Sequence, residues 1–202
     1  MPPTLSHVVV ELHRGINGST NLISTIKSFG IPRIQLEMIV EMAFLRIFVS
    51  WESFLEESFI RYATGAITPA GYGPERLINP QNLGHALDLI HSGRDYINWN
   101  SASEVIQRSA LYFQDGEPYR SALEPAIIDL DEMNIIRNRI AHKSAKSKSK
   151  FNSFIRRKFG HSVRGMTPGR LLLTQHPSTA PGTFLNYYID LLTLTSETII
   201  PQ

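Results

Sequence analysis

The sequence predicts an all-α protein, an up-and-down bundle of helices with a loop and short-helix insert. Apolar residues recur at three- and four-residue spacings over long stretches, as one face of an α-helix requires. No stretch shows a convincing alternation of apolar and polar residues, so strands are not expected. An internal repeat, a heptad run and a glycine-rich phosphate loop are also absent from the sequence. Helices joined by loops in this way favour a bundle.

Composition narrows the class of protein further. A chain of 202 residues has the length of one domain and can bury about 70% of its unfolded surface. The 42% hydrophobic content indicates a packed core, and the absence of cysteine excludes disulfides, thiolate catalysis and Cys-ligated zinc. The first residues lack the features of a signal peptide, and no apolar run reaches the roughly 20 residues that span a bilayer. We therefore expect a soluble, cytoplasmic protein with no membrane partner.

The first two predicted helical regions are the most regular. Residues 4–29 form one long or two short helices, because Gly15 and Gly18 could break the segment. Residues 33–64 give the strongest helix prediction, and their apolar stripe is too wide for one surface face. Such a stripe is typical of a helix that is buried centrally or pairs with a partner chain.

We interpret residues from about 66 to 118 as an insert in the bundle. Its expected role is that of a lid, a partner-docking surface or a substrate-specificity element. The elements predicted within it are a loop over 66–82, a short helix over 82–90, a turn at 96–100 and a helix capped by Ser101 or Ser103. His85, Asp88 and His91 have spacings that suggest metal ligands. No second cluster of ligands accompanies them, so we expect no metal site and no cofactor.

The next helix, predicted from Tyr119 onward, carries the most informative polar residues. Pro125 either is tolerated near its first turn or marks a restart of the helix. Asn138 and His142 are four residues apart and share a face, while Arg137 lies about 100° round the helix axis. If the helix is continuous, Arg137 and His142 are offset by roughly 7.5 Å along it. A guanidinium binds phosphate oxygens in a fork, and an imidazole transfers protons near neutral pH. The pattern suits two groups acting on either side of a phosphate.

A basic strip begins directly after His142. Between Lys143 and Lys158 there are seven basic residues and no acidic one, within a segment of about 143–183 that we expect to be irregular apart from a basic helix over 151–159. Such a strip attracts polyanions, although a solvated flexible loop is the alternative. The predicted RNA contacts are Lys143, Lys146, Lys148, Lys150, Arg156, Arg157 and Lys158.

Two blocks of sequence are similar to one family. Arg137-Asn138-x-x-x-His142 resembles the Arg-x4-His signature of HEPN-domain proteins, and the earlier block Ser50–Phe59 is similar to the second helix of the RiboL-PSP-HEPN branch. The resemblance covers about residues 1–145 and the last helix. It implies a small all-α bundle, and many proteins of this family are metal-independent ribonucleases of toxin–antitoxin and phage-defence systems.

The resemblance also implies roles for individual residues. His142 is the expected general base or acid, Arg137 the group that neutralises charge on the phosphorus, and Asn138 the group that positions the substrate or His142. Glu52 and Glu56, one turn apart, are expected either to orient Arg137 or His142 or simply to face solvent. The implied partners are RNA, a second copy in a homodimer with a composite site, and an antitoxin or defence protein.

Several alternatives remain open at this stage. His161 and His176 are weaker candidates for a second proton carrier. The protein could be an inactive RNA- or nucleotide-binding module, or a protein-interaction adaptor. In the adaptor, Arg137 would pair with Glu52 or Glu56 and His142 with a backbone carbonyl.

Overall fold

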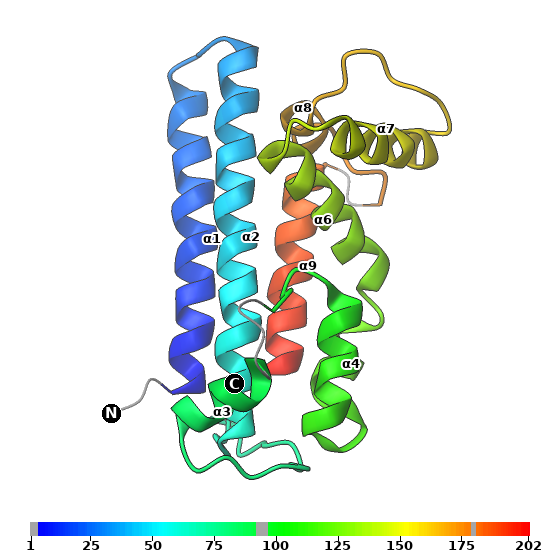
Figure 1. Cartoon of the computed structure of the whole chain (residues 1–202). Coiled ribbons are helices and arrows are strands. Elements are labelled where there is room, and N and C mark those ends of the chain that lie inside the picture. The colour runs from blue at the N-terminus through cyan, green and yellow to red at the C-terminus, as the bar shows by residue number, and fades with distance from the viewer. Residues whose placement is uncertain (1–3, 92–96, 179–180) are drawn as a thin grey trace. The chain divides into compact units, whose positions relative to one another are not determined.

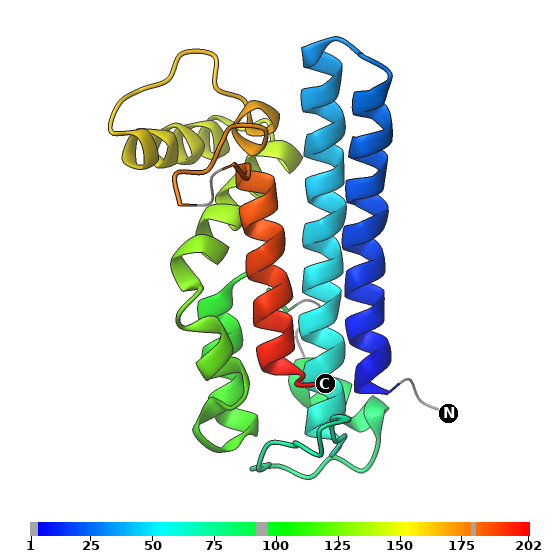
Figure 2. The same cartoon turned by 180° about the vertical axis from the view of Figure 1, so that it is seen from behind.

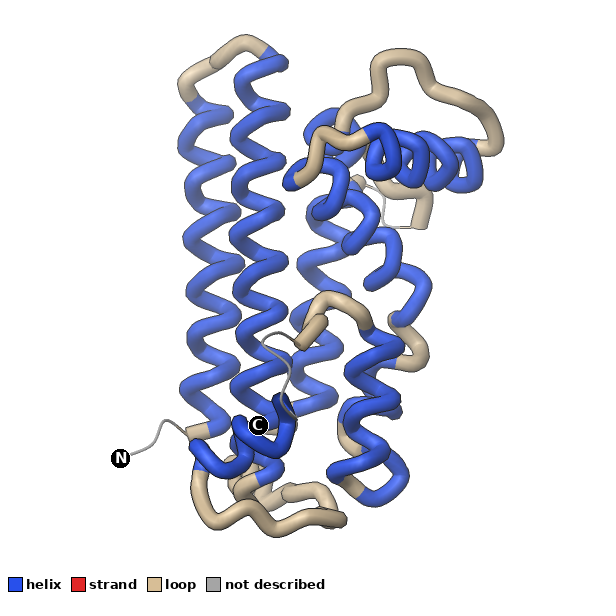
Figure 3. The backbone as a smooth tube through the Cα atoms, in the orientation of Figure 1, coloured by secondary structure: helices blue, strands red, loops and turns tan. Residues whose placement is uncertain are grey.

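The computed structural model describes residues 4–91, 97–178 and 181–202. Figures 1 and 2 show these residues from two sides, and Figure 3 shows that helices and loops account for them. Over this part of the chain there is no strand beyond two isolated bridges, so the prediction of an all-α bundle is confirmed. The helices are α1 (Leu5–Ser28), α2 (Arg33–Ala63), α3 (Leu83–His91), α4 (Ala102–Tyr112), α5 (Tyr119–Leu123), α6 (Ile127–Ala141), α7 (Ala145–Phe159), α8 (Pro168–Leu172) and α9 (Phe184–Ile199).

Most predicted helices form where the sequence placed them. The first is one long helix that passes through Gly15 and Gly18, and α2 matches the strongest prediction. Ser101 caps α4 by accepting a hydrogen bond from the Glu104 N–H, and Asn82 accepts one from the His85 N–H at the start of α3. The predicted turn at 96–100 begins at Tyr96, which lies outside the described residues. None of the described helices is both long and apolar enough to cross a membrane.

The chain falls into two compact units. The first comprises Met1–Arg14, Ser50–Ile128 and Leu192–Gln202, and the second Gly15–Val49 and Asp129–Leu191. The expectation of one domain with an insert stays a prediction.

The first unit has an aromatic core centred on Phe59. The ring centroid of Phe59 lies 5.4 Å from those of Trp99 and Tyr112, 5.0 Å from that of Phe113 and 5.1 Å from that of Tyr119. Three of these four partners come from the predicted insert and are buried. The insert is therefore part of the hydrophobic core of this unit. None of the three roles expected for the insert predicted such a contribution to the core.

The second unit begins with a helical hairpin. The end of α1 and the start of α2 lie antiparallel and are joined by residues 29–32 (Figures 1 and 2). Gly30 adopts a φ of +63°, a left-handed conformation that glycine accepts without steric cost.

The prediction that residues 143–183 are largely irregular was wrong for the first part of that segment. Helix α7 covers fifteen residues, is capped by the Ser144 hydroxyl and ends at Gly160 in the left-handed conformation. Its sequence is strongly basic, yet Phe151, Phe154 and Ile155 share one buried face. Burial of this face outweighs the repulsion between exposed cations, because fully burying each such side chain contributes about 1.5–3 kcal/mol.

Helix α8 is held against α2 by polar contacts. The Gly169 N–H donates to Glu41 Oε1 at 2.8 Å, and the Thr167 hydroxyl donates to Glu37 Oε2 at 2.8 Å. A Cβ atom at Gly169 would lie 2.7 Å from the carbonyl carbon of Glu37. The two backbones approach this closely only because residue 169 has no side chain.

We therefore expect Gly169→Ala to lower the free energy of unfolding by about 1–3 kcal/mol, because the methyl group must push α8 away from α2. The matched control is Gly18→Ala, since Gly18 lies in α1 with open space around its Cβ position. That change should stabilise the protein by about 0.5–1 kcal/mol. Urea unfolding of both variants measures the difference, and equal effects would contradict the close packing of α8.

Candidate functional site

The helix that carries the candidate site restarts after Pro125, one of the two alternatives that the sequence left open. Residues 124–126 form a turn around Pro125, so α5 (Tyr119–Leu123) ends before it and α6 begins at Ile127. It ends at Ala141, one residue before His142, although the His142 N–H still donates to the Asn138 carbonyl oxygen at 3.0 Å. Leu130, Met133 and Ile136 of α6 are buried, whereas Ile127 and Ile140 are half-buried.

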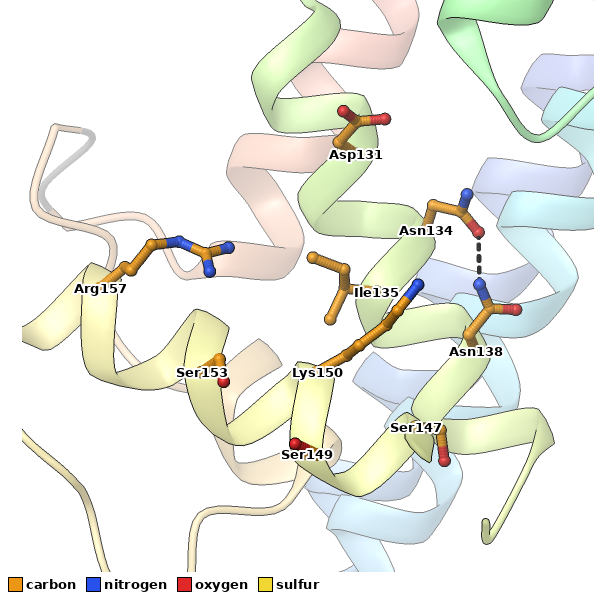
Figure 4. A pocket seen from close by; sticks show the side chains of 9 residues that line it. All are labelled: Asp131, Asn134, Ile135, Asn138, Ser147, Ser149, Lys150, Ser153 and Arg157. Atoms are coloured by element: carbon orange, nitrogen blue, oxygen red, sulfur yellow. Dashed lines mark hydrogen bonds between the residues drawn. The ribbon is translucent and has the colours of Figure 1, made fainter. Parts of the chain in front are cut away.

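Two predicted site residues are joined on α6 by hydrogen bonds. Nη1 of Arg137 donates to Oδ1 of Asn138 at 3.1 Å. Nδ2 of Asn138 donates to Oδ1 of Asn134 at 2.8 Å, as Figure 4 shows. All three side chains are half-buried. Asn134 was not predicted as a site residue, although its four-residue spacing from Asn138 places it on the same face. The amide of Asn138 is thus oriented from both sides.

The turn between α6 and α7 is fixed by two serines. The Ser144 hydroxyl accepts a hydrogen bond from the Ser147 N–H at 3.2 Å. The Ser147 hydroxyl is buried and lies within donating distance of the His142 and Ser144 carbonyl oxygens. The backbone of His142 is therefore held in place, while its side chain is exposed.

Helices α6 and α7 enclose an open pocket of about 450 Å³. On α6, the residues that line this pocket are Asp131, Asn134, Ile135 and Asn138. On α7, three serines, Lys150 and Arg157 line it. Figure 4 shows Lys150 and Arg157 extending from α7 towards α6. They are seven residues apart, or two helical turns, and therefore share a face. We call this cavity the α6–α7 pocket.

The charged side chains that line the α6–α7 pocket favour an anion. Two are cationic, Lys150 and Arg157, and Asp131 is the single carboxylate among them. Burial raises the pKa of Asp131 above its usual value of 3.8, because desolvation disfavours the charged form. Protonation of Asp131 therefore begins at a higher pH than for a solvated carboxyl, which makes the pocket more positive as the pH falls.

The other predicted basic residues divide into two groups. Lys143, Lys146, Lys148 and Arg156 are exposed. Lys158 instead is half-buried, and its Nζ donates to both carboxylate oxygens of Glu132 at 3.1 and 2.8 Å. Lys158 therefore forms an internal ion pair, and its assignment to RNA contacts stays a prediction. Its partner lies 26 residues earlier, a separation that local sequence spacing does not reveal.

Glu52 and Glu56 lie on the part of α2 that belongs to the first unit. Oε1 of Glu56 lies 3.9 Å from Nε2 of His91, which gives this carboxylate a neighbour in its own unit. Orientation of Arg137 or His142 by Glu52 or Glu56 stays a prediction.

The two weaker histidine candidates differ in their accessibility. His161 is exposed. His176 is only 3% exposed, and its ring stacks on Tyr187 with centroids 3.9 Å apart. Burial lowers the pKa of His176, so its neutral form is favoured. His176 is therefore excluded as a proton carrier for a substrate bound at the surface.

Within the described residues, no group of three or more His, Asp or Glu side chains is arranged to hold a metal ion. His85, considered above as a ligand, accepts a hydrogen bond at Nδ1 from the Gln81 N–H at 3.2 Å.

Comparison with known proteins adds no assignment, since no family model, curated protein or solved structure matches the chain. The resemblance to HEPN proteins thus depends on the two sequence blocks alone, and membership of that family is a proposal.

The Ser147 hydroxyl gives a direct test of the α6–α7 turn. We expect Ser147→Ala to lower the free energy of unfolding by about 1 kcal/mol, because the hydrogen bonds from the buried Ser147 hydroxyl to the His142 and Ser144 carbonyl oxygens are lost. Ser149→Ala is the control, since Ser149 is exposed on the same helix. Thermal or urea unfolding measures both variants, and a Ser147→Ala protein as stable as the control would contradict the role of this hydroxyl.

Proposed function

We propose that this protein is a metal-independent endoribonuclease of the HEPN type, acting in a toxin–antitoxin or phage-defence setting. The observation that carries the proposal is that Asn138 and Asn134 line a cationic pocket and that Arg137 is hydrogen-bonded to Asn138. The exposed His142 follows directly after the same helix. This arrangement combines phosphate recognition with an acid–base group, which RNA cleavage requires.

In the proposed reaction, the ribose 2′-hydroxyl attacks the adjacent phosphorus. A base takes the 2′-hydroxyl proton, the bond from phosphorus to the 5′-oxygen breaks, and an acid gives a proton to that oxygen. The products are a 2′,3′-cyclic phosphate and a 5′-hydroxyl end. His142 performs one of the two proton transfers, Arg137 stabilises the negative charge on the pentacoordinate phosphorus, and Asn138 positions the substrate.

The RNA strand is proposed to lie along α7. Lys150 and Arg157 face the α6–α7 pocket, and Lys143 and Lys146 are exposed near the His142 end of that helix. Contacts of this kind with phosphates are largely independent of base sequence. The proposal therefore includes RNA as a class of substrate rather than a particular base sequence.

A second copy of the chain would supply the other proton carrier, and α2 supports such pairing. An apolar stripe on this helix remains exposed in the second unit: Ile34, Met38, Met42 and Val49 are 74%, 59%, 69% and 54% exposed. Their spacings of four, four and seven residues place them along one line of the helix. Contiguous exposed apolar surface is typical of protein interaction sites. The same stripe could instead bind an antitoxin or a defence protein.

An RNA-binding module without turnover is the second candidate. It is favoured by the position of the His142 side chain, which is exposed and does not line the α6–α7 pocket. In this case the cationic pocket binds RNA and His142 contributes nothing to chemistry. A third possibility, a protein-interaction adaptor, would use the α2 stripe and leave Arg137 with a structural role.

Cleavage of total cellular RNA in the presence of EDTA tests the leading proposal. We expect the wild-type protein to produce 2′,3′-cyclic phosphate ends, and His142→Ala to reduce the rate by about 10²–10⁴ with little loss of RNA affinity, because one proton carrier is gone. Arg137→Lys should reduce the rate by about 10²–10³, because a lysine cannot form the bidentate contact.

His7→Ala serves as the control for the histidine change, because His7 is exposed on α1 and lies in the first unit. It should cleave like the wild type. RNA binding without cleavage by any protein would favour the binding module, and neither binding nor cleavage would favour the adaptor.

The charge balance of the α6–α7 pocket gives a second prediction. We expect Asp131→Asn to bind RNA more tightly than the wild type at pH 7, because the variant removes the one carboxylate that lines the pocket. As the pH falls towards the raised pKa of Asp131, the wild-type affinity should approach that of the variant. Fluorescence anisotropy at several pH values measures both, and a constant ratio of affinities would contradict the role of Asp131.

A further inference from the structure

A second cationic cavity of about 480 Å³ lies in the same unit, between α7 and residues 162–166. We call it the α7–loop pocket. Lys148 and Arg156 face it from α7, and Arg164 faces it from the loop. Lys148 lies about 160° round the helix axis from Lys150, at 100° per residue. The two pockets therefore use opposite flanks of one helix.

Charge in the α7–loop pocket is not balanced. No Asp or Glu residue lines it, and none of the described carboxylates forms an ion pair with Lys148, Arg156 or Arg164. Three cations around one cavity repel one another, and a bound anion relieves this repulsion. Two of the three are arginines, whose forked donors match phosphate oxygens.

The interior of this pocket is suited to more than an inorganic ion. Three apolar residues line it: Ile155 is 2% exposed, and Val163 and Met166 are half-buried. Apolar side chains beside a group of cations can contact a sugar or a base while the cations bind the phosphate. The chemical class that fits best is a nucleotide.

The loop that carries Arg164 is fixed at both ends. Gly160 ends α7 with a φ of +74°, and Thr167 caps α8, which is bonded to α2 through Gly169. Within the loop, Gly165 has a φ of +72° and its carbonyl accepts a hydrogen bond from Nη1 of Arg170 at 3.5 Å. This pocket is therefore formed by ordered backbone on both sides rather than by side chains alone.

We infer that the α7–loop pocket binds a second nucleotide of the same RNA strand that occupies the α6–α7 pocket, an inference that rests on the proposed function. An α-helix with its side chains is about 10–12 Å across, a distance that a short single strand can bridge. The strand then crosses α7 and contacts cations on both flanks. Short RNAs reach one pocket, and longer RNAs reach both.

Binding of 2′-O-methylated single-stranded RNA tests this inference separately from cleavage, because that RNA lacks the attacking hydroxyl. The variant is Lys148→Gln/Arg164→Gln. We expect it to bind a dodecanucleotide about tenfold more weakly than the wild type, and to bind a trinucleotide equally well. The slope of log affinity against log salt concentration should fall by about 1.4 for the dodecanucleotide, about 0.7 for each lost phosphate contact.

The matched control is Arg14→Gln/Lys27→Gln, which removes the same two charges from exposed positions of α1. This control should retain the wild-type affinity for the dodecanucleotide. Circular dichroism establishes that each variant is folded.

The possible failures are distinguishable. If Lys148→Gln/Arg164→Gln binds the dodecanucleotide as tightly as the wild type, this inference is overturned and the proposed function stands. The same conclusion follows if the control variant loses as much affinity as the pocket variant. A wild-type protein that binds neither RNA would overturn both proposals. If the NMR chemical shifts of the Gly165 and Met166 amides change on titration with AMP and the protein does not bind RNA, the pocket is assigned to a free nucleotide instead.

Discussion

The buried face of α7 is the constraint on which the rest of the candidate surface depends. Phe151, Phe154 and Ile155 are almost completely buried, and fully burying each contributes about 1.5–3 kcal/mol. Exposed ion pairs contribute about 0–1 kcal/mol, so packing rather than charge sets the rotation of the helix. With the rotation fixed, Lys150 and Arg157 must face α6, and Lys148 and Arg156 must face the opposite loop.

The same packing explains why Lys158 differs from its neighbours. At 100° per residue, Lys158 lies about 40° from Phe154 on the helix and so falls at the edge of the buried face. A lysine there needs a carboxylate partner, since an unpaired buried charge is costly. Glu132 provides it, and the Tyr188 hydroxyl donates to the same carboxylate at 3.1 Å. The basic sequence thus contains one structural cation among several solvent-facing ones.

Sequence patterns predicted the helices well, because each signal is local. The wide stripe of α2, the cap at Ser101 and the restart after Pro125 all depend on residues within one or two helical turns. Helix α7 was only partly predicted, because the many charged residues in its sequence favoured a solvated loop over a helix with three apolar residues on one face. Pairings between distant segments, such as Lys158 with Glu132 or Phe59 with Trp99, follow from tertiary packing and leave no local signal.

Only the local part of the candidate site was predicted from the sequence. Arg137 and Asn138 are adjacent in sequence and bonded in the structure, and Asn134 completes the set one turn earlier. The α6–α7 pocket could not be predicted, because it requires the direction that the chain takes after His142. Ser144 and Ser147 set that direction through bonds within the turn. A pattern of serines in a basic segment does not by itself distinguish a capped turn from a solvated loop.

The position of His142 bears on the choice between an enzyme and a binding module. A histidine that transfers protons usually has one ring nitrogen held by a hydrogen bond, which fixes the tautomer and the ring orientation. Within the described part of one chain, hydrogen bonds hold the His142 backbone, and the imidazole is exposed. An enzyme built on this site therefore requires RNA or a second chain to orient the ring. Where a second chain orients the ring, catalysis by His142 depends on pairing of the chains, for which the exposed α2 stripe is suited, whereas simple RNA binding requires neither.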